Sequence, residues 1–227
     1  MDPRKLNPFL RHGRSFEKAL AEYLKPPKPV DVRLHELLPP AIYQFKIQIR
    51  TLAPAVWRRV QVPNDLTLHQ LHRVIQILFG WWDYHLHHFE IQGTRYGIPD
   101  PEMRDIINDR RRRLRDFTAR AGTKWRYEYD YGDSWFHVLT LERILPPREG
   151  FVPECLKGVR AGPKEDSGGP WGYVEKLRIM RDPTHPEHTD ICDWMGRDLD
   201  PERFDLNLTN VALQREFARH QRKRKKD

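Results

Sequence analysis

The chain has little cysteine and no long apolar run, and each shortage excludes a class of protein. Cys155 and Cys192 are the only cysteines among 227 residues, far too few for a disulfide-stabilised scaffold. No segment approaches the ~18 consecutive apolar residues of a membrane span. Residues 1–14 are polar and lack the apolar segment of a signal peptide. We therefore expect a cytoplasmic protein without membrane association, large enough to form one substantial core.

The chain also lacks an excess of charge outside two short segments. Its net charge is +8. Residues 215–227 hold seven Lys and Arg against two acidic residues, and residues 109–116 hold five Arg against two Asp, which accounts for the whole excess. Such clusters bind nucleic-acid phosphates without reading sequence, although they are also common on solvated helices and tails. The predicted nucleic-acid contacts are Arg110, Arg111, Arg112, Arg113, Arg115, Arg222, Lys223, Arg224, Lys225 and Lys226.

The order of apolar patterns predicts an α+β fold in a single domain. We expect a Pro-rich N-terminal arm with one short helix at residues 1–41, the domain at 42–213 and a basic tail at 214–227. Strands joined by hairpins and interrupted by helices favour a mostly antiparallel sheet with packed helices. Thr67 and Gln70 form a capping box at the start of one helix, which Gly80 ends. The other expected helices are at 108–120, 170–181, 185–195 and 210–221, and the strands are at 42–50, 56–62, 85–91, 95–98, 124–131 and 134–144.

The segment Tyr129–His137 concentrates acidic, glycine and aromatic residues that neither core packing nor solubility requires. A two-residue turn at Gly132-Asp133 predicts a hairpin in which Glu128 faces His137. Glu128, Asp130 and His137 would then share the face opposite the aromatic core residues. This cluster suits metal binding or acid–base chemistry, and the simpler interpretation is a cross-strand salt bridge beside a turn.

The segment Pro163–Tyr173 carries two glycines before a predicted helix, a pattern that can hold a phosphate. Glu165 and Asp166 argue against a phosphate because carboxylates repel an anion, and the Lys-Ser/Thr pair of a P-loop is absent. A helix cap by Asp166 or Ser167 is the interpretation we favour. Alternatively, Glu165 and Asp166 coordinate a hard divalent cation. Together with His137, they are the candidate catalytic residues of a metal-dependent enzyme.

Histidine and cysteine residues supply further candidate metal ligands. Three of them share a face of the helix predicted at 185–195, and Cys155 can complete a Cys₂His₂ set, although the spacing matches no familiar zinc site. His85 and His87 lie on the same side of a predicted strand as Phe89, which suits packing as well as ligation. No cofactor other than a divalent metal is expected. The candidate metal ligands are His85, His87, Glu128, Asp130, Cys155, His185, His188 and Cys192.

Several short motifs follow one another in an order that is similar to a known family. They are Tyr43-Gln-Phe-Lys-Ile47, Pro54-Ala-Val-Trp-Arg58, Leu68-His-Gln-Leu-His72, Gly80-Trp81, His85-Leu-His87 with Phe89, the two segments above, Pro153-x-Cys155-x-x-Gly158 and Asp200-Pro-Glu-Arg-Phe-Asp-Leu206. Over residues 41–213 the chain resembles the plasmid pRiA4b ORF-three-like family, also met as passenger proteins of bacterial insertion sequences. The resemblance implies an association with mobile elements, and some members carry a resolvase-like label.

The chain is also short of serine, which argues against recombinase chemistry. A serine recombinase needs an activated nucleophilic serine. Only Ser15, Ser134 and Ser167 are present, in the Pro-rich arm and in acidic loops. We therefore interpret the chain as an accessory or binding protein, rather than an enzyme, that contacts nucleic acid non-specifically. A metal-dependent enzyme and a protein–protein adaptor are the alternatives.

Overall fold

The computed structural model describes residues 38–99, 105–117 and 119–224, with the backbone alone for 219–224. All of them belong to one compact unit, Arg33–Asp227. They form the predicted α+β fold, and the N-terminal arm lies outside the described residues except for 38–41. The strands are β1 (Ile42–Ile49), β2 (Trp57–Pro63), β3 (His87–Ile91), β4 (Thr94–Gly97), β5 (Ile106–Asn108), β6 (Lys124–Tyr129), β7 (Trp135–Leu145) and β8 (Glu154–Val159), and the helices are α2 (Leu68–Phe79), α3 (Gly169–Met180), α4 (His188–Met195) and α5 (Leu206–Arg224).

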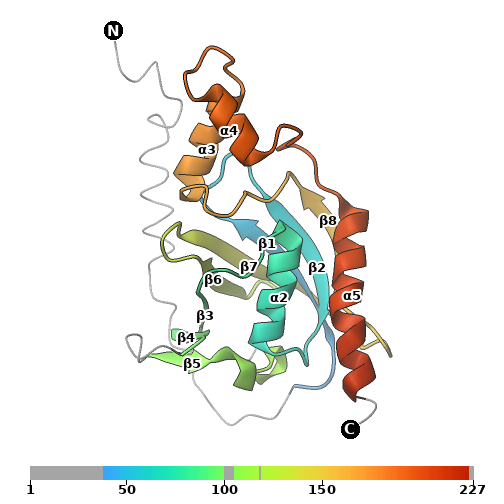
Figure 1. Cartoon of the computed structure of the whole chain (residues 1–227). Coiled ribbons are helices and arrows are strands. Elements are labelled where there is room, and N and C mark those ends of the chain that lie inside the picture. Colours follow the sequence, from blue (N-terminus) through green and yellow to red (C-terminus); the bar gives the residue numbers. More distant parts are fainter. Residues whose placement is uncertain (1–37, 100–104, 118, 225–227) are drawn as a thin grey trace. The chain divides into compact units, whose positions relative to one another are not determined.

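A single eight-stranded sheet organises the described chain, in the order β5-β4-β3-β6-β7-β1-β2-β8 (Figure 1). Every neighbouring pair is antiparallel except β4 and β5. α2 lies across the sheet with α5 beside it, and α3 and α4 pack against each other (Figure 1). The central strands β3, β6, β7 and β1 carry many of the buried aromatic residues, so the core lies along the middle of the sheet.

Helix α2 begins and ends as the sequence predicts. The Thr67 hydroxyl accepts a hydrogen bond from the Gln70 backbone, and the Gln70 side chain accepts one from the Thr67 backbone, which completes the capping box. Gly80 ends the helix at φ 77°, a left-handed conformation that glycine adopts without strain. The helix buries His72 and Gln76 together with its apolar side chains. These two polar side chains belong to the network described below.

A buried arginine fastens the segment before α5 to the sheet. Arg58 of β2 is 1% exposed and donates hydrogen bonds to three backbone carbonyl oxygens at 2.8–2.9 Å. Its guanidinium also contacts the rings of Phe79 and Phe204, 5.0 and 4.0 Å from their centroids. Burial lowers the pKa of Arg58 to about 10, so the side chain stays charged at neutral pH.

Two parts of the secondary structure differ from the prediction. Residues 108–120 do not form a helix, because strand β5 is followed by two 3₁₀ turns, Asp109–Arg111 and Leu114–Asp116. Backbone hydrogen bonds to the segment that precedes α2 replace those of a helix. The loop predicted at residues 146–169 contains strand β8, which pairs with β2. Both errors arise because hydrogen bonds to segments distant in the sequence determine these structures, and local sequence patterns do not predict such bonds.

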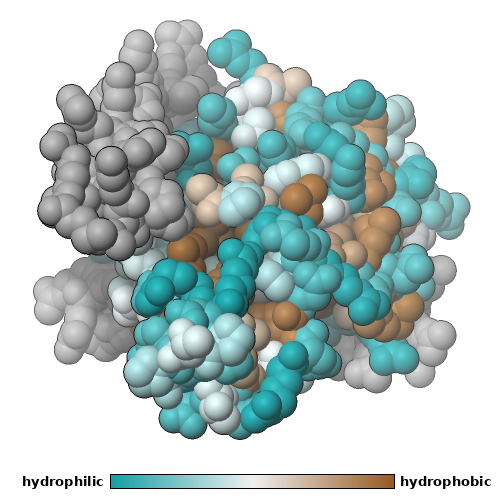
Figure 2. Space-filling model, turned by 90° about the horizontal axis from the view of Figure 1, so that it is seen from above, coloured by the Kyte–Doolittle hydropathy of each residue, from teal (hydrophilic) through white to brown (hydrophobic). Residues whose placement is uncertain are grey.

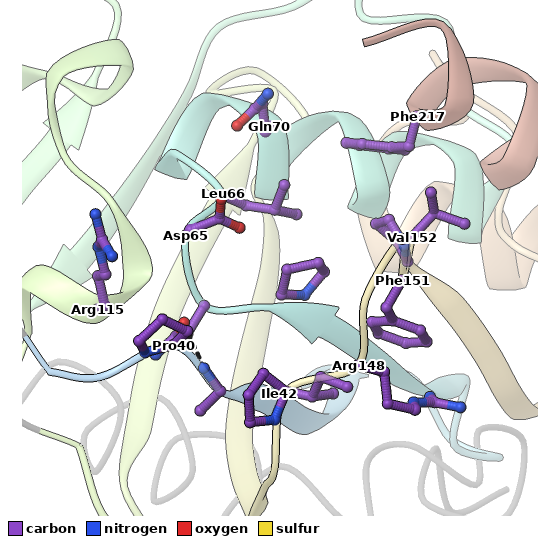
Figure 3. Close-up of a pocket in the computed structure, with 16 residues that line it drawn as sticks. Pro40, Ile42, Asp65, Leu66, Gln70, Arg115, Arg148, Phe151, Val152 and Phe217 are labelled. Carbon is purple, nitrogen blue, oxygen red and sulfur yellow. Dashed lines mark hydrogen bonds between the residues drawn. The ribbon is translucent and has the colours of Figure 1, made fainter. Parts of the chain in front are cut away.

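The described surface is a mixture of polar and apolar groups. Viewed from above, brown apolar residues lie scattered among teal polar ones (Figure 2). A pocket of about 280 Å³ opens beside the start of β1, and Phe217 of α5 and Arg115 contribute to its wall (Figure 3). None of the candidate metal ligands lines this pocket. Among the described helices, none is both long and apolar enough to cross a membrane.

Candidate metal centre

The β6–β7 hairpin is closed by a longer turn than predicted. Tyr127, instead of Glu128, pairs with His137. The Asp130 carboxylate accepts hydrogen bonds from two backbone N–H groups of the turn, at 3.0 and 3.2 Å, which holds additional residues in the turn. This shift of one residue moves His137 to the other face of the sheet. The prediction that Glu128, Asp130 and His137 share one face was therefore wrong.

The hairpin turn and the Gly-rich loop meet in the fold. Gly168 donates its backbone N–H to the Asp133 carboxylate at 3.0 Å. Gly169 approaches so closely that a Cβ atom there would lie 2.4 Å from the Asp133 carbonyl oxygen. Gly168 is the N-cap of α3 and no side chain caps the helix, so the predicted cap by Asp166 or Ser167 was wrong. The glycines instead allow the backbone contact that brings the loop to the hairpin.

Glu165 of the loop is buried and fixes two neighbouring segments. Its carboxylate accepts hydrogen bonds from the Tyr129 hydroxyl and from the Trp82 backbone N–H, the latter at 2.8 Å. The Tyr129 hydroxyl accepts a hydrogen bond from the Tyr84 backbone at 3.1 Å. Burial, and then the Glu165 carboxylate, raise the pKa of Tyr129 above its ordinary value, so the hydroxyl remains a neutral donor. Glu165 therefore positions the segments around it.

Beside Glu165, three side chains from separate segments form a cluster that we call the surface centre: His85, Asp130 and Asp166. His85 Nε2 lies 3.0 Å from Asp166 Oδ1 and 3.6 Å from Asp130 Oδ2. Neither contact is a hydrogen bond, the one with Asp130 because of its length, and Nε2 is buried without a hydrogen-bond partner among the described residues. One ligand atom from each side chain lies within 4.8 Å of the other two.

These contacts fit the coordination of one shared ion. Two ligand atoms that each lie about 2.1 Å from an ion, at an angle of about 90–110°, are about 3.0–3.4 Å apart. In such a site the ion occupies the axis of the imidazole lone pair, and the second ligand lies to the side of that axis. A His–Asp hydrogen bond would instead place the carboxylate oxygen near the axis. The 3.0 Å contact of His85 with Asp166, which is not a hydrogen bond, has the separation of two co-ligands, and the 3.6 Å contact with Asp130 is slightly longer.

The backbone in and beside the surface centre adopts an uncommon conformation. Asp83, Asp130 and Asp166 have φ values of 64°, 59° and 59°. The left-handed region costs a residue with a Cβ atom about 1 kcal/mol, somewhat less for Asp and Asn, and such residues concentrate at functional sites. The fold therefore holds these three carboxylates in place at a cost in free energy.

Two exposed aromatic side chains flank the surface centre. Trp82 is 74% exposed and Tyr84 is 72% exposed. Their backbone N–H groups are nevertheless fixed by hydrogen bonds to Glu165 and Tyr129. Large rings held at the surface beside polar groups are typical of sites that bind a flat, partly apolar ligand.

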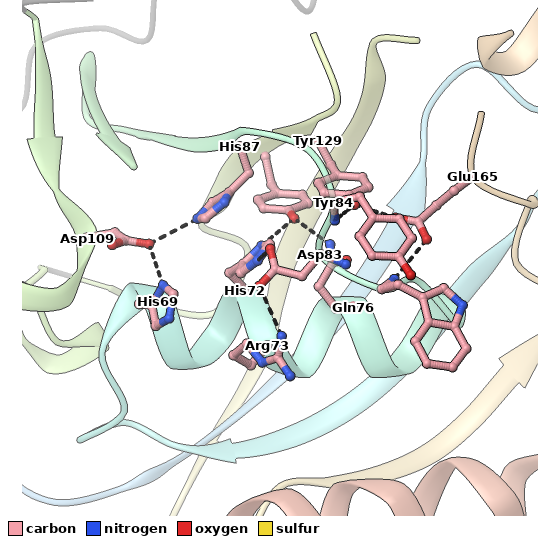
Figure 4. A network of polar contacts seen from close by, with 12 residues as sticks. His69, His72, Arg73, Gln76, Asp83, Tyr84, His87, Asp109, Tyr129 and Glu165 are labelled. Atoms are coloured by element: carbon pink, nitrogen blue, oxygen red, sulfur yellow. Dashed lines mark hydrogen bonds and ion pairs between the residues drawn. The ribbon is translucent and has the colours of Figure 1, made fainter. Parts of the chain in front are cut away.

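A second group of histidines and carboxylates lies along α2 (Figure 4). His72 Nδ1 contacts the Tyr127 hydroxyl at 2.8 Å, and His72 Nε2 contacts Asp83 at 2.7 Å. The His72 ring stacks on His87, with centroids 3.5 Å apart and planes at 4°. Burial lowers the pKa of His72 to about 4, so this ring is neutral at pH 7. Burial alone would raise the pKa of Asp83, but its contacts with His72 and Arg73 bring it to about 2.

The other end of this network is the buried carboxylate of Asp109. Its Oδ2 lies 3.0 Å from His87 Nε2 and 3.4 Å from His69 Nδ1. Burial raises the pKa of Asp109, but the contacts with the two imidazoles outweigh burial and leave the pKa below its ordinary value. We call His69, His87 and Asp109 the buried cluster.

Four residues of this network were not predicted from the sequence: His69, His72, Asp83 and Asp109. His69 and His72 are three residues apart on a predicted helix, which places them on one face, and this spacing was a usable signal. Asp109 gave no signal because its segment was predicted as part of a helix. His85 and His87, predicted to share a face, belong to the surface centre and the buried cluster respectively.

Other predicted site residues lie elsewhere. His137 is buried, its Nδ1 contacts the Trp135 carbonyl oxygen at 2.8 Å, and burial lowers its pKa to about 3. Glu128 lies 3.8 Å from His88, and burial raises the pKa of Glu128 to about 7. In the described chain, no group of three potential ligands includes Cys155, His185, His188 or Cys192.

The predicted arginine contacts do not form one helical face. Arg110 and Arg111 are exposed, whereas Arg113 donates a hydrogen bond to the Asp65 carbonyl oxygen at 2.7 Å. Arg110 and Glu216 of α5 line the same pocket, of about 310 Å³. Arg110 therefore lies near α5, whose helical backbone continues to Arg224.

The fold and the site define a class of α+β protein in which an open sheet and its loops assemble histidine and carboxylate clusters. The chain matches the family described as Plasmid pRiA4b ORF-3-like protein over residues 41–208 and belongs to this family, as its motifs indicated. It is 34% identical to Uncharacterized protein y4hQ of Sinorhizobium fredii over 186 residues, which cover 81% of this chain and 96% of that protein. It is also similar to the crystal structure of the protein of unknown function MM3350 from Methanosarcina mazei Go1, with 38% identity, a TM-score of 0.68, and coverage of 74% of this chain and 96% of that one.

Proposed function

We propose that the chain binds a divalent metal ion at the surface centre and uses it to hold an oxygen-containing ligand. The supporting observation is the position of His85 Nε2, which lies 3.0 and 3.6 Å from two carboxylate oxygens without a hydrogen bond to either. Two carboxylates that face one imidazole also supply the negative charge that a cation requires. This arrangement favours the metal-dependent function over a pure adaptor.

Three protein ligands leave coordination positions open for water or substrate, as in catalytic rather than structural metal sites. One imidazole with two carboxylates suits Mn²⁺ or Zn²⁺. An ion in such a site lowers the pKa of a bound water or polarises a phosphoryl or carbonyl oxygen, so hydrolysis is the reaction class that it supports. The exposed rings of Trp82 and Tyr84 favour a ligand with a flat apolar part.

The substitution Asp130→Asn separates metal binding from the fold. The Asn side-chain oxygen can still accept the two hydrogen bonds of the turn, but the side chain no longer supplies a carboxylate to the ion. In a Mn²⁺ titration followed by electron paramagnetic resonance, we expect the full chain to bind one ion and Asp130→Asn to bind it about 10-fold more weakly or worse.

Asp133→Asn is the matched control, because Asp133 lies in the same turn but outside the surface centre. Its side-chain oxygen can keep the hydrogen bond to Gly168, so it should bind Mn²⁺ as the unaltered chain does. Equal affinities for Asp130→Asn and Asp133→Asn, or no binding by the unaltered chain, would contradict the proposal.

Non-specific nucleic-acid binding is a second candidate function, supported by the position of α5. Because Arg110 and α5 border one pocket, the exposed part of the arginine run and the helical residues 222–224 belong to neighbouring elements. Together they would offer phosphate contacts on one side of the molecule. An association with mobile elements remains a prediction from the family resemblance.

The test of this second function must spare the core. Leu213 and Phe217 are 0% and 4% exposed, so the tail should be removed only from Arg222 onward. We expect the shortened chain, and more so its combination with Arg110→Gln and Arg111→Gln, to bind duplex DNA more weakly and with a smaller salt dependence. An unchanged salt dependence would exclude these residues as phosphate contacts.

A further inference from the structure

We infer that the buried cluster of His69, His87 and Asp109 is a second metal site, which binds zinc. It would join helix α2, strand β3 and the turn after β5, which supply one ligand each. The site shares no ligand with the surface centre, so each of the two proposals can be tested without the other.

The distances within the buried cluster are close to those of co-ligands, and a bound ion would replace the hydrogen bond between His87 Nε2 and Asp109 Oδ2. His87 Nε2 and His69 Nδ1 lie 3.0 and 3.4 Å from the same oxygen of Asp109, and one ligand atom from each of the three lies within 4.8 Å of the others. Ligands about 2.1 Å from a tetrahedral zinc are about 3.4 Å apart. Figure 4 shows His69 and His87 directed at Asp109 from two different elements.

Three atoms of the buried cluster lack a hydrogen-bond partner. Among the described residues, His69 Nδ1, His87 Nδ1 and Asp109 Oδ1 are buried without one. Asp109 is 1% exposed, and a buried polar atom without a partner is costly. A metal ion bound to His69 Nδ1 and to the Asp109 carboxylate would give each of these two side chains a bonding partner.

The charge of Asp109 also calls for a cation. Its ion-pair contacts in the described part of the chain are with the imidazoles of His69 and His87 alone. His87 also stacks face to face on His72, with ring centroids 3.5 Å apart, which fixes its ring beside Asp109. A divalent ion supplies the compensating charge directly.

The neighbouring triad of His72, Asp83 and His87 is a weaker candidate although its atoms are equally close. Asp83 already has a counter-charge, Arg73 at 3.0 Å, and both ring nitrogens of His72 have hydrogen-bond partners. Two imidazoles and one carboxylate suit zinc better than manganese. The buried cluster should therefore prefer zinc more strongly than the surface centre does.

An ion can reach the buried cluster from a pocket beside the start of α2. The His69 side chain is 15% exposed and lines the pocket of about 310 Å³ that Arg110 and Glu216 also border. His69 is the rim ligand, whereas His87 and Asp109 lie behind it with side chains that are 0% and 1% exposed. His69 is thus the residue whose substitution tests the site with least risk to the fold.

The test uses the full chain carrying Asp130→Asn, so that binding at the surface centre does not contribute. After treatment with a chelator and loading with Zn²⁺, this chain should retain one zinc by metal analysis. Its Tm should rise by about 5 °C or more at a roughly 100-fold excess of Zn²⁺ over Kd. Adding His69→Gln should abolish both effects, and adding His88→Gln, a neighbouring histidine outside the buried cluster, should abolish neither.

Circular dichroism of each variant establishes that it is folded. Failure of the Asp130→Asn chain to retain zinc would overturn the inference, as would a Tm rise that persists in the His69→Gln variant. Loss of zinc in the His88→Gln variant to the same extent would also overturn it. Loss of Mn²⁺ binding in Asp130→Asn with retained zinc would instead support both proposals, at separate sites.

Discussion

The surface centre and the buried cluster use the same types of ligand but differ in burial and in how the chain supplies them. Asp166 is 64% exposed, and the surface centre is assembled by two loops and the segment before β3. Asp109 is 1% exposed, and its partners lie on α2 and β3. The surface centre is open to solvent, whereas two of the three ligands of the buried cluster are almost fully enclosed. The two clusters therefore differ in access to solvent although they use the same types of ligand.

The approach of Gly169 to the hairpin is the point at which the surface centre is most easily broken. Gly169→Ala would place a Cβ atom 2.4 Å from the Asp133 carbonyl oxygen, at a φ of 67°. We expect a loss of about 3 kcal/mol in the free energy of unfolding, measured by urea denaturation, together with loss of Mn²⁺ binding.

Gly93→Ala is the matched control for that prediction. Gly93 also has a positive φ, 79°, but a Cβ atom added there would have nothing within 4 Å. It should lose only the conformational cost, about 1 kcal/mol, and retain Mn²⁺ binding. Equal losses for the two substitutions would show that the backbone contact with Asp133 does not matter.

The contrast in burial predicts unequal effects of removing a carboxylate. Asp109→Asn should lower the free energy of unfolding by about 2 kcal/mol, because a buried charge-assisted contact is replaced by an imperfect one. Asp166→Asn should change it by less than about 0.5 kcal/mol, since Asp166 is largely exposed and Asn tolerates its positive φ. Comparable effects in chemical denaturation would contradict the assignment of one buried and one exposed cluster.

Acid sensitivity should come largely from histidines that belong to neither metal cluster. The pKa of His137 falls to about 3 in the folded state, against an ordinary value of 6.5, because it is buried. The unfolded chain therefore takes up a proton first, and stability is lost as pH falls below about 6.5. Between pH 7 and 5 we expect His137→Leu to reduce this loss by about 2 kcal/mol. The measurement is the slope of unfolding free energy against pH, and an unaltered slope would contradict the prediction.

The smallest expected effect concerns a carboxylate that neither cluster uses. Burial raises the pKa of Glu128 to about 7 from 4.5, so its charged form costs stability once the pH rises above about 4.5. Glu128→Gln should therefore stabilise the protein at pH 8, by about 1 kcal/mol. At pH 4 the substitution should have little effect, and thermal unfolding at the two pH values compares them.

Much of the fold was predictable because its signals are local. The alternation in β1, the capping box of α2 and the Pro170 start of α3 each specify an element from adjacent residues. The register of the β6–β7 hairpin was not predictable in this way. It depends on hydrogen bonds from the turn to the Asp130 side chain, which override the two-residue turn that Gly132-Asp133 suggests.

The candidate sites were predictable only as separate residues. His85, Asp130 and Asp166 were each predicted as site residues but in different clusters, because their meeting depends on the approach of Gly169 to Asp133. Asp109 was missed because hydrogen bonds to the segment before α2 turn its own segment away from a helix. The sequence shows which residue types can bind a metal, whereas long-range contacts between loops produce no periodic pattern from which they could be predicted.

The buried Arg58 also limits how far the chain can be shortened. Its guanidinium contacts Phe204, 4.0 Å from the ring centroid, and Phe204 belongs to the segment that leads into α5. Deleting that segment would open one side of an interior cation to water while its carbonyl partners remain in place. The smallest autonomous version of this domain must therefore extend past Phe204, in agreement with the family match that ends at residue 208.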